Sequence, residues 1–579
     1  PPLAYFLKSK IHFPALLLPS ARMSNQHPSV MLPCHDGAKW PKICDMVKKY
    51  ASGGPPDTNS LRQFIIELQH TLTNSKRFTI EQFNSIFEAI PPSDQNRFRS
   101  FAIPQMCRSV LAMRRLFRTA VPALIPGRLG CVTLTAEQCF SLLAAGFLCI
   151  LPFQKGPPGS RGLAINFFGL FRNTQPNKVQ KLQCFVLYFI RMSEIIDKGD
   201  RDEMDRPIEF RRLVSQRRRG AEWWGRAEQV LGEVVVKASD DKIEDSNQLQ
   251  ADFANRCLGG GVLSQGCVQE EIRFAISPEL VVSRLLMAPL LPLEAAIITG
   301  SKRFTAYDGY ASSFTCTGLC TDPAPVHPRN KAVHSFVVAL DATNFHHADR
   351  SVQYGVGNML RETNKALAAV QFKDVRADSL AFASGNWGCG AFGGDPQLKF
   401  LLQWMACSVA DRALHYYPFT DPRVKKMADV VQMLRQGQWT VGRLWTFLLD
   451  RSADSTLKTK GAFKTLFEHL NQTYAEEEED IPVPMEEEEA LPADQPMDEA
   501  ELYFSGLGGD LDFGEDELLA GPHLPPDDAD MGNYEPPKNN HSDAVMRDTG
   551  RDESGMDRQG FDDFLLAHMG GGSSASDDK

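Results

Sequence analysis

The spacing of apolar residues changes near residue 228, and this change limits the folds open to the chain. Between about residues 60 and 200, apolar residues recur every three or four positions, as in LRQFIIELQHTL and AEQCFSLLAAGFLCIL. This is the period of amphipathic helices. From about 228 to 450, short β-branched runs such as EVVVKA, AAIITG and HSFVVALDA alternate with helical segments. We therefore predict a helical domain followed by an α/β domain, in which helices cover strands.

Composition sets the outer limits of these domains. Residues 1–58 contain SGGPPDTNS near their end and read as largely irregular. We place the helical domain at 59–227 and the α/β domain at 228–452. From 453 to 579 the chain contains segments such as AEEEEDIPVPMEEEEALPADQPMDEAE, rich in acids and prolines. Such a segment supplies too little apolar surface to offset its ordering entropy, so we expect a disordered acidic tail.

Charge is divided unevenly along the chain. The net charge is −10, yet residues from about 475 onward hold 31 acidic and 5 basic residues, which leaves 41 acidic and 57 basic residues before them. A basic body favours an anionic partner such as nucleic acid, a nucleotide polymer or a phosphorylated surface. The tail either competes with that partner, or folds on a protein partner through GDLDFGEDELLAG and GFDDFLLAHMGGG, or only solubilises the chain.

Three further patterns narrow the possible functions. The run RRLVSQRRRG at 211–220 fits a nuclear localisation signal, a polyanion contact or a solvated helix face. The thirteen cysteines lack paired CxxC motifs, which favours reduced thiols over a zinc site. No apolar run reaches the roughly 18 residues of a membrane span.

Two glycine-rich stretches in the α/β region indicate a ligand. Gly259, Gly260 and Gly261 precede the helical pattern QEEIRFAISPELVVSRLL, and GNWGCGAFGGD at 385–395 follows the strand-like LAFAS. Glycines let backbone N–H groups approach a phosphate, and a helix N-terminus adds positive potential. Alternatively, Glu270 and Glu271 only occupy a first helical turn, where carboxylates are favoured. Two such loops suit a pyrophosphate, and neither matches the Rossmann or Walker pattern.

The run DFANRCLGGGVLSQGCVQEEIRF resembles the signature of the poly(ADP-ribose) glycohydrolases. The resemblance continues through IITGSKRFTAYDGYASSF, VVALDATNF, RETNKA and GNWGCGAFGGD. Upstream, VMLPC, SLLAAGFLCILP and INFFGLF resemble the helical accessory domain of the animal-type enzymes. Over roughly residues 30 to 450 it implies a macrodomain-like α/β catalytic domain, with a mixed sheet flanked by helices, after an all-α accessory domain.

The resemblance implies roles for residues at the scissile bond. Glu271 is expected to be the catalytic acid/base, with Glu270 and Gln269 holding the ribose and Asp252 and Asn255 supporting the site. Breaking a ribose–ribose O-glycosidic bond passes through an oxocarbenium-like transition state, which needs a proton on the leaving oxygen and nearby negative charge. We expect Glu271 to hold that proton because of burial and its acidic neighbour, and Glu270 to stay ionised.

The resemblance also implies the rest of the substrate site. Tyr310 is expected to close over the bound ADP-ribose and Phe392 to pack beside the distal ribose. The two glycine loops are expected to cradle the pyrophosphate, through Gly259, Gly260 and Gly261 and through Gly388, Gly390 and Gly393. Ile243, Glu244 and Phe419 are expected to bind the adenine, and Asn386 is a further expected substrate-binding residue. Asp308 stands where the vertebrate form carries a small hydroxyl residue.

By resemblance, the chain is a hydrolase that releases ADP-ribose and needs no metal or cofactor. The implied partners are poly(ADP-ribose) and ADP-ribosylated proteins, with no membrane; protein partners of the acidic tail are left open. A monomer in the nucleus and cytoplasm is expected. Two alternatives remain open at this point: a macrodomain that binds ADP-ribose without cleaving it, and a scaffold that acts through its tail.

Overall fold

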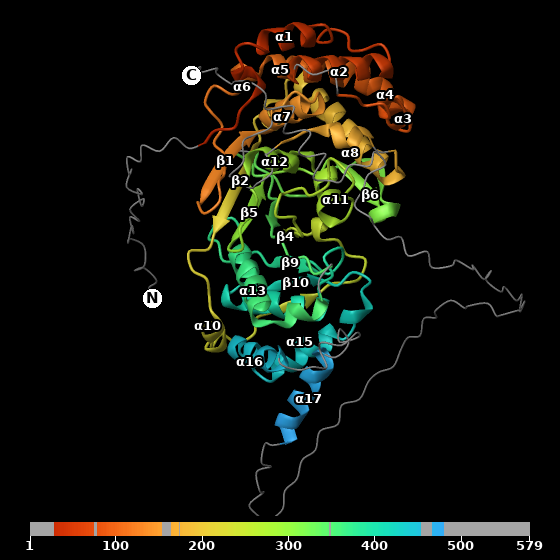
Figure 1. Ribbon diagram of the computed structural model, residues 1–579. Coiled ribbons are helices and arrows are strands. Elements are labelled where there is room, and N and C mark those ends of the chain that lie inside the picture. Colours follow the sequence, from red (N-terminus) through yellow and green to blue (C-terminus); the bar gives the residue numbers. More distant parts are fainter. Residues whose placement is uncertain are drawn as a thin grey trace, which may run out of the picture. The chain divides into compact units, whose positions relative to one another are not determined.

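The computed structural model describes residues 28–73, 78–152, 164–172, 174–329, 331–346, 349–452 and 466–479. The acidic motifs of the predicted tail, GDLDFGEDELLAG and GFDDFLLAHMGGG, lie outside these residues. The described chain has a helical region at its N-terminal side and an α/β region after it (Figure 1). This is the predicted fold class.

Helices dominate the described chain up to residue 204 (Figure 1). Their bounds are α1 (Trp40–Lys48), α2 (Thr58–Thr73), α3 (Phe83–Glu88), α4 (Pro92–Arg97), α5 (Ile103–Leu111), α6 (Met113–Leu116), α7 (Ala136–Phe147), α8 (Pro176–Asp197) and α9 (Arg201–Met204). Helix α8 is buried along most of its length. It contacts α5 and α7 within the helical region, and α11 (Gln269–Ile276) and β7 (Thr315–Leu319) in the α/β region.

Helix α1 lies in the stretch expected to be irregular. Its buried residues Trp40, Ile43 and Val47 are three and four positions apart, so they share one face. Pro41 sits in the first turn, where its missing N–H costs no helical hydrogen bond. The segment is too short and too rich in neighbouring breakers for this period to stand out in the sequence.

The α/β region is built on an eight-stranded sheet with the order β1-β2-β5-β8-β4-β9-β10-β3. The strands are β1 (Gly130–Thr135), β2 (Pro207–Val214), β3 (Val234–Val236), β4 (Leu249–Asp252), β5 (Glu294–Thr299), β8 (Phe336–Ala339), β9 (Phe382–Gly385) and β10 (Leu414–Tyr417). The pairs from β8 through β4, β9 and β10 to β3 are parallel. The pairs β1–β2, β2–β5 and β5–β8 are antiparallel, so the sheet is mixed. A separate hairpin pairs β6 (Thr305–Asp308) with β7.

Two strands of this sheet come from the part of the sequence predicted as helical. In β2, Arg212 is fully buried, donates to the carbonyls of Ala288 at 2.6 Å and Pro289 at 2.7 Å, and forms an ion pair with Glu294. Arg212 therefore neither faces solvent from a helix nor is available to contact a polyanion. A buried, paired charge breaks the alternation of apolar and polar residues by which a strand is read from sequence.

Helices cover both faces of the sheet. Alternate residues of a strand point to opposite faces, and the two cores follow this rule: Ile298 and Val337 join the core shared with the helical region, whereas Ile297 and Val338 join the other core. The helices of the α/β region are α10 (Ala221–Gly225), α11, α12 (Ser283–Leu286), α13 (Val356–Val370), α14 (Pro396–Val409), α15 (Met427–Gln436) and α16 (Val441–Ser452). The sheet is buried on both faces, as parallel strands require.

Helix α17 (Leu466–Glu479) lies within the segment expected to be a disordered tail. Its first turns bury Leu466, Phe467 and Leu470 in the core that α14 and α16 share. The N–H of Phe467 donates to the side chain of Gln397 at 3.0 Å. Three apolar residues ahead of the acidic run are enough to anchor this helix.

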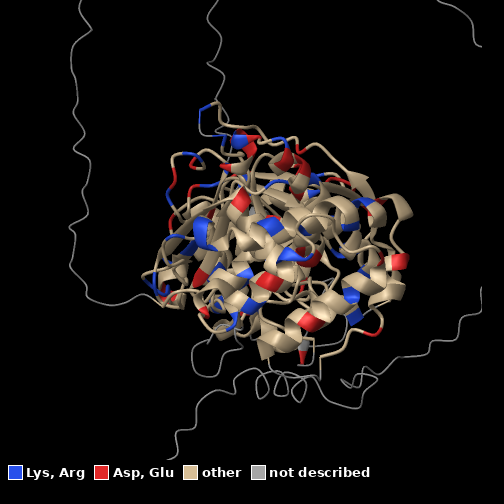
Figure 2. Cartoon of the chain, turned by 90° about the horizontal axis from the view of Figure 1, so that it is seen from above, with Lys and Arg blue, Asp and Glu red and all other residues tan. Residues whose placement is uncertain are grey.

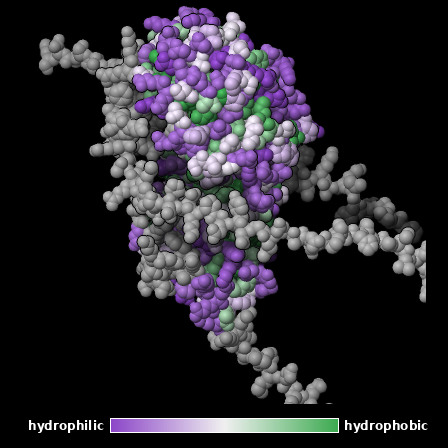
Figure 3. All heavy atoms as spheres, turned by 90° about the vertical axis from the view of Figure 1, so that its right-hand side faces the viewer, coloured by the Kyte–Doolittle hydropathy of each residue, from purple (hydrophilic) through white to green (hydrophobic). Residues whose placement is uncertain are grey.

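The surface carries both signs of charge. Seen from above, Lys and Arg are interspersed with Asp and Glu over the described elements (Figure 2). The face shown in Figure 3 is mostly hydrophilic, with small hydrophobic areas between polar residues. No helix in the described ranges is long and apolar enough to cross a membrane. Over the same ranges, no cluster of three or more His, Cys, Asp or Glu side chains is arranged to hold a metal ion.

Candidate active site

The carboxyl ends of β3, β10, β9 and β4 lie side by side at one edge of the sheet, because these strands are parallel neighbours. Each is followed by predicted site residues. Ile243 and Glu244 follow β3, Phe419 follows β10, the second glycine loop follows β9, and the first glycine loop follows β4. In open α/β sheets, ligands bind at this edge.

Glu270 is held by backbone donors on both of its carboxyl oxygens. Its Oε1 accepts the N–H of Gly259 at 2.6 Å, and its Oε2 accepts the N–H of Asn255 at 2.9 Å. The side chain is almost completely buried. Both donors belong to the segment that links β4 to α11, so the glycine loop fixes the direction of this carboxylate.

Glu271 is held in the same way by the next part of that segment. Its Oε1 accepts the N–H of Gly261 at 2.8 Å, and its Oε2 accepts the N–H of Val268 at 3.0 Å. The Val268 contact is the return bond of a helix cap, from the third helical residue to the residue that precedes α11. The two glutamates thus lie in adjacent, separately held positions in the first turn of α11.

The carboxylates leave room only for glycine in the loop. Gly260 has a φ of +43°, and a Cβ there would lie 2.4 Å from Glu271 Oε1 and 2.6 Å from Glu270 Oε2. A Cβ on Gly266 would lie 2.3 Å from Glu271 Oε1. The glycine triplet and the glutamate pair are therefore two halves of one packing arrangement.

This arrangement differs from the phosphate-binding role expected for the first loop. The N–H groups of Gly259 and Gly261 donate to the glutamates, and that of Gly260 donates to the carbonyl of Cys257 at 3.2 Å. All three amides already have protein acceptors. The glycines permit close approach of the backbone as predicted, but the anions that approach it are the chain's own carboxylates.

Asp252, the last residue of β4, is buried beside the pair. Neither of its carboxyl oxygens has a hydrogen-bond partner within the described ranges. Burial raises the pKa of Asp252 to about 8; the charge of Arg273 opposes this rise and that of Glu271 adds to it. A buried carboxylate without partners is costly, so Asp252 holds a proton at neutral pH.

Glu270 also has a raised pKa, chiefly because of burial and then because of the charges of Asp252 and Glu271. The N–H groups of Asn255 and Gly259 act in the opposite direction. These effects favour the protonated form of Glu270 and do not support the expectation that it stays ionised; a neutral Asp252 removes one of the two repulsions but not the effect of burial. The cluster as a whole retains a proton near neutral pH.

Two cations that the sequence patterns do not single out lie behind the loop. Arg284 of α12 donates to Leu258 O at 3.1 Å and to Gly260 O at 2.8 Å. Lys181 of α8 is fully buried. Its Nζ donates to four carbonyl oxygens of the loop, those of Gly261 at 3.2 Å, Val262 at 3.0 Å, Ser264 at 3.0 Å and Gly266.

Two features of the surroundings of Lys181 have opposite effects on its charged form. Burial lowers the pKa of Lys181 to about 7, while carbonyl oxygens around Nζ favour the ammonium form. Lys178, one turn earlier in α8, donates to the carbonyl of Gln265. The signal for both was a pair of lysines three residues apart, directly before the mostly apolar stretch LQCFVLYFI of α8.

Gln269 ties α11 to the end of β4. Its Nε2 donates to Ala251 O at 3.0 Å, and its Oε1 accepts the N–H of Phe253 at 2.8 Å. Both polar atoms of the side chain are thus bound to the backbone of the strand end, where the resemblance placed a contact with ribose. The backbone N–H of Gln269 donates to the hydroxyl of Tyr310 at 3.2 Å.

Asn255 and Asn386 also bind the chain itself. Asn255 Oδ1 accepts the N–H of Cys257 at 3.0 Å. Asn386 Nδ2 donates to Pro418 O at 2.8 Å, and its Oδ1 accepts the hydroxyl of Tyr416 at 2.8 Å. Asn386 therefore joins the loop after β9 to the loop after β10.

The second glycine loop leaves several amides free. Gly393 N–H donates to Gly390 O, and Gly394 N–H donates to Gly388 O. Phe392 accepts from Phe345 through its carbonyl. The amides of Gly388, Gly390, Ala391 and Phe392 have no acceptor in the described part of the chain. This loop, unlike the first, can offer N–H donors to an anion.

Aromatic rings lie at the other side of the site. Tyr310 and Phe419 have ring centroids 5.8 Å apart, and both are unusually exposed for large side chains, at 41% and 57%. Ile243 is buried against Ala383 and Tyr417 at the ends of β9 and β10. Exposed ring faces suit a flat base.

Glu244 lies next to this group and accepts a hydrogen bond from the hydroxyl of Tyr307. It follows β3, as Ile243 does, and so it reaches the same edge of the sheet. Tyr307, in β6 of the hairpin that carries Tyr310, was not among the predicted residues. Asp308 is exposed at the end of the same strand.

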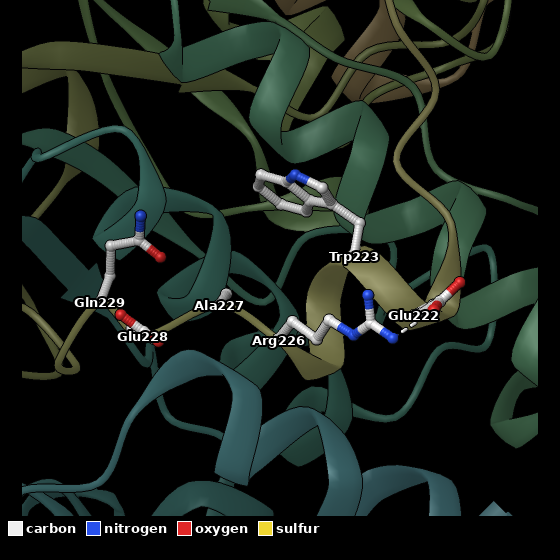
Figure 4. Close-up of a pocket in the computed structure, with 6 residues that line it drawn as sticks. All are labelled: Glu222, Trp223, Arg226, Ala227, Glu228 and Gln229. Carbon is white, nitrogen blue, oxygen red and sulfur yellow. Dashed lines mark ion pairs between the residues drawn. The ribbon is translucent and has the colours of Figure 1, made fainter.

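A cavity of about 420 Å³ lies elsewhere, around α10. Glu222, Trp223, Arg226, Ala227, Glu228 and Gln229 line it (Figure 4). Arg226 and Glu222 form an ion pair at its rim, at 2.6 Å, and both side chains are mostly exposed. None of the predicted site residues lines this cavity.

Comparison with known proteins gives two adjoining family matches. Residues 221–426 match the model described as poly(ADP-ribose) glycohydrolase, macro domain fold. Residues 90–212 match the model described as poly(ADP-ribose) glycohydrolase, helical domain. The first match contains every predicted site residue, and the second contains Lys181.

Two plant relatives are similar to this chain over most of their own length. Poly(ADP-ribose) glycohydrolase 1 of Arabidopsis thaliana is 29% identical over 535 residues, which cover 75% of this chain and 94% of that protein. Probable poly(ADP-ribose) glycohydrolase 2 of the same plant is 27% identical, over 72% of this chain and 92% of that protein. Poly(ADP-ribose) glycohydrolase 1 of Caenorhabditis elegans is 30% identical over 55% of this chain and 40% of its own length.

Proposed function

The chain belongs to the poly(ADP-ribose) glycohydrolase family, and from that membership we propose that its glutamate pair hydrolyses the ribose–ribose O-glycosidic bonds of poly(ADP-ribose). The observation that carries this proposal is the way the loop after β4 holds two adjacent carboxylates, each by two backbone N–H groups. They lie at the edge of the sheet where four loops converge. The product is ADP-ribose.

Glu271 is the acid/base of the proposed reaction. Its Oε2 contacts Val268, which is exposed, and the next residue, Gln269, bonds to the hydroxyl of Tyr310. Glu271 therefore lies on the side of the pair that substrate approaches. It gives a proton to the leaving ribose oxygen as the bond breaks, and then takes a proton from the attacking water.

Glu270 stabilises the positive charge that develops on the ribose. Protonated Asp252 lies beside it, and two backbone amides hold its oxygens. In the proposed reaction Glu270 carries the negative charge that an oxocarbenium-like transition state needs nearby, and the neutral Asp252 does not repel that charge. Before the bond breaks, Asp252 and Glu271 are thus protonated and Glu270 is ionised in this proposal; Glu271 gives up its proton and Asp252 keeps its own.

The second glycine loop binds the pyrophosphate in this proposal. Gly388, Gly390, Ala391 and Phe392 have the free amides that a phosphate requires, whereas the amides of the first loop are occupied by the glutamates. Tyr310 and Phe419 hold the adenine-bearing end between or against their exposed rings. Ile243 and Glu244 border the same end.

The test is release of ADP-ribose from purified poly(ADP-ribose), with binding of ADP-ribose measured separately by calorimetry. Wild type should release ADP-ribose. Glu271→Gln, which keeps the shape of the side chain but cannot donate the same proton, should bind ADP-ribose with similar affinity and lose about 10³-fold or more in kcat. Gln472→Ala, an exposed change in α17, serves as the control and should match wild type.

Two results would refute the proposal. A wild type that binds ADP-ribose and releases none would make the chain a reader of ADP-ribose rather than a hydrolase. A Glu271→Gln variant with wild-type kcat would leave the activity in place and remove Glu271 from the mechanism. The compartments in which the protein acts, which we expect to be nucleus and cytoplasm, are a separate question for localisation of the tagged chain.

A further inference from the structure

Arg284 bonds to two carbonyl oxygens of the first glycine loop, those of Leu258 and Gly260. One nitrogen of its guanidinium group, Nη1, makes both bonds. The two carbonyls are two residues apart, and the residue between them, Gly259, has a φ of +78°. That left-handed conformation, which glycine adopts without steric cost, is part of the turn that brings both carbonyls to the same side chain.

The same two peptide units carry the amides that hold the glutamates. The C=O of Leu258 shares a peptide unit with the N–H of Gly259, and this N–H donates to Glu270 Oε1 at 2.6 Å. The C=O of Gly260 shares a peptide unit with the N–H of Gly261, which donates to Glu271 Oε1 at 2.8 Å. In a planar trans peptide, C=O and N–H point in opposite directions. A donor that fixes the direction of the C=O group therefore also fixes the direction of the N–H group.

We propose that Arg284 is a positioning residue for the reaction: through these two peptide units it sets the directions of the amides that hold Glu270 and Glu271. The inference rests on the proposed function, since it concerns the placement of the groups that act on the glycosidic bond. In the described part of the chain, the guanidinium group of Arg284 bonds to backbone carbonyls and to neither glutamate. It acts through the backbone.

The positive charge of Arg284 strengthens both of the hydrogen bonds from these peptide units to the glutamates. A cation on a carbonyl oxygen polarises the peptide unit and makes its N–H a better donor. Burial lowers the pKa of Arg284, and the charges of Glu270 and, less strongly, Glu271 oppose that effect. Arg284 is thus electrostatically coupled to the two carboxylates although no direct contact joins them.

The test compares Arg284→Ala with Arg412→Ala. Arg412 is also largely buried and also donates to backbone carbonyls, those of Val370, Ala377 and Leu380, but it serves another loop. Arg284→Ala should lower kcat for release of ADP-ribose by about 10²-fold, the loss typical of a misplacement of about 1 Å. The affinity for ADP-ribose should change by less than about 3-fold. Arg412→Ala should lower the thermal midpoint without lowering kcat per folded molecule.

Chemical rescue separates positioning from a purely structural role. Arg284 is partly exposed, so added guanidinium can reach the space that Arg284→Ala leaves. Guanidinium chloride at low, non-denaturing concentration should restore part of the lost kcat, and sodium chloride at the same concentration should not. If Arg284→Ala does not fold, Arg284→Lys is used as the test variant. Its shorter side chain, which lacks the guanidinium group, should lower kcat while the affinity for ADP-ribose is retained.

The outcome that overturns the inference is a kcat for Arg284→Ala, or for Arg284→Lys if only that variant folds, equal to wild type. A kcat loss that guanidinium and sodium chloride affect alike would also overturn it. These results presuppose an active wild type. An inactive wild type would instead refute the proposed function, so the two failures are distinguishable.

Discussion

At the scale of single residues, the site depends on which backbone amides are occupied and which are free. The glycine triplet could be placed in a loop before a helix from sequence alone, because glycines and helix-start signals are local. The acceptors of its amide N–H groups could not be predicted from sequence, because the side chains of Glu270 and Glu271 reach back to the loop from the first turn of α11. Arg284 and Lys181 were missed for the same reason: their bonds join segments that are distant in the sequence.

Gly260→Ala should disable the site with little effect on the rest of the fold. A methyl group there would lie within 2.6 Å of oxygens of both glutamates, and the φ of +43° disfavours any side chain. We expect kcat for ADP-ribose release to fall by about 10²-fold or more. Gly357→Ala is the matched control, because a Cβ there meets nothing within 4 Å. Equal activity of the two variants would contradict the packing argument.

Asp252 should make stability depend on pH. Its pKa is about 8 in the folded protein and about 4 in an unfolded chain. The folded state therefore keeps a proton that the unfolded state has lost. The associated stability is fully present below about pH 4 and is lost as the pH rises through about 8.

Asp252→Asn removes this dependence, because asparagine stays neutral at every pH in this range. Between about pH 5 and pH 8.5 the thermal midpoint of the variant should improve steadily relative to that of wild type. Calorimetric scans across this range measure the difference. A difference that is constant with pH would show that Asp252 is already ionised in the folded protein.

At the scale of elements, sequence periodicity found helices of the N-terminal region from α2 onward and two of the strands that supply the loops, β3 and β9. It missed the other two, because β4 was read as part of an irregular segment and the start of β10 as the end of a helix. It also missed β1 and β2; in β2, the buried charge of Arg212 interrupts the pattern. It also could not show that α8 reaches from the helical region to the catalytic loop. That contact is made by Lys178 and Lys181, whose Nζ atoms bind carbonyl oxygens between Gly261 and Gly266.

Lys181→Met should therefore affect both stability and activity. The variant leaves four loop carbonyls without their buried donor, at a cost of about 1–3 kcal/mol for each group left unsatisfied, less what the loop recovers by relaxing. We expect a lower thermal midpoint and a lower kcat, measured by calorimetry and by ADP-ribose release. The exposed Lys48→Met is the control and should change neither. A stable Lys181→Met protein with full activity would mean that α8 does not support the loop.

At the scale of the whole molecule, composition correctly separated a basic body from an acidic C-terminal segment. It failed at residues 466–479, where α17 begins with buried apolar residues before the acids start. Composition is an average over many residues, so three apolar residues at the edge of an acidic run hardly change the average. Burial of those three residues depends on a core formed by α14 and α16, and the composition of the C-terminal segment holds no information about that core.

Truncation should reveal the contribution of α17. A chain that ends at Glu479 keeps Leu466, Phe467 and Leu470 in the core, and a chain that ends at Ser452 lacks them. Each buried apolar side chain contributes about 1.5–3 kcal/mol before ordering entropy is subtracted. We expect the thermal midpoint of the shorter chain to be about 5 °C lower. Equal midpoints would indicate that α17 adds nothing to the fold.

The measurement that tests the central claim most directly is the dependence of Glu271→Gln on the leaving group. ADP-ribose can be linked at the anomeric carbon either to the ribose of a second unit or to 4-nitrophenol, which needs no proton to leave. If Glu271 is the acid, Glu271→Gln should lose about 10³-fold or more in the rate of bond cleavage with the ribose leaving group, and far less with nitrophenol, with azide supplied as a nucleophile that needs no base. An equal loss with both leaving groups would contradict the account.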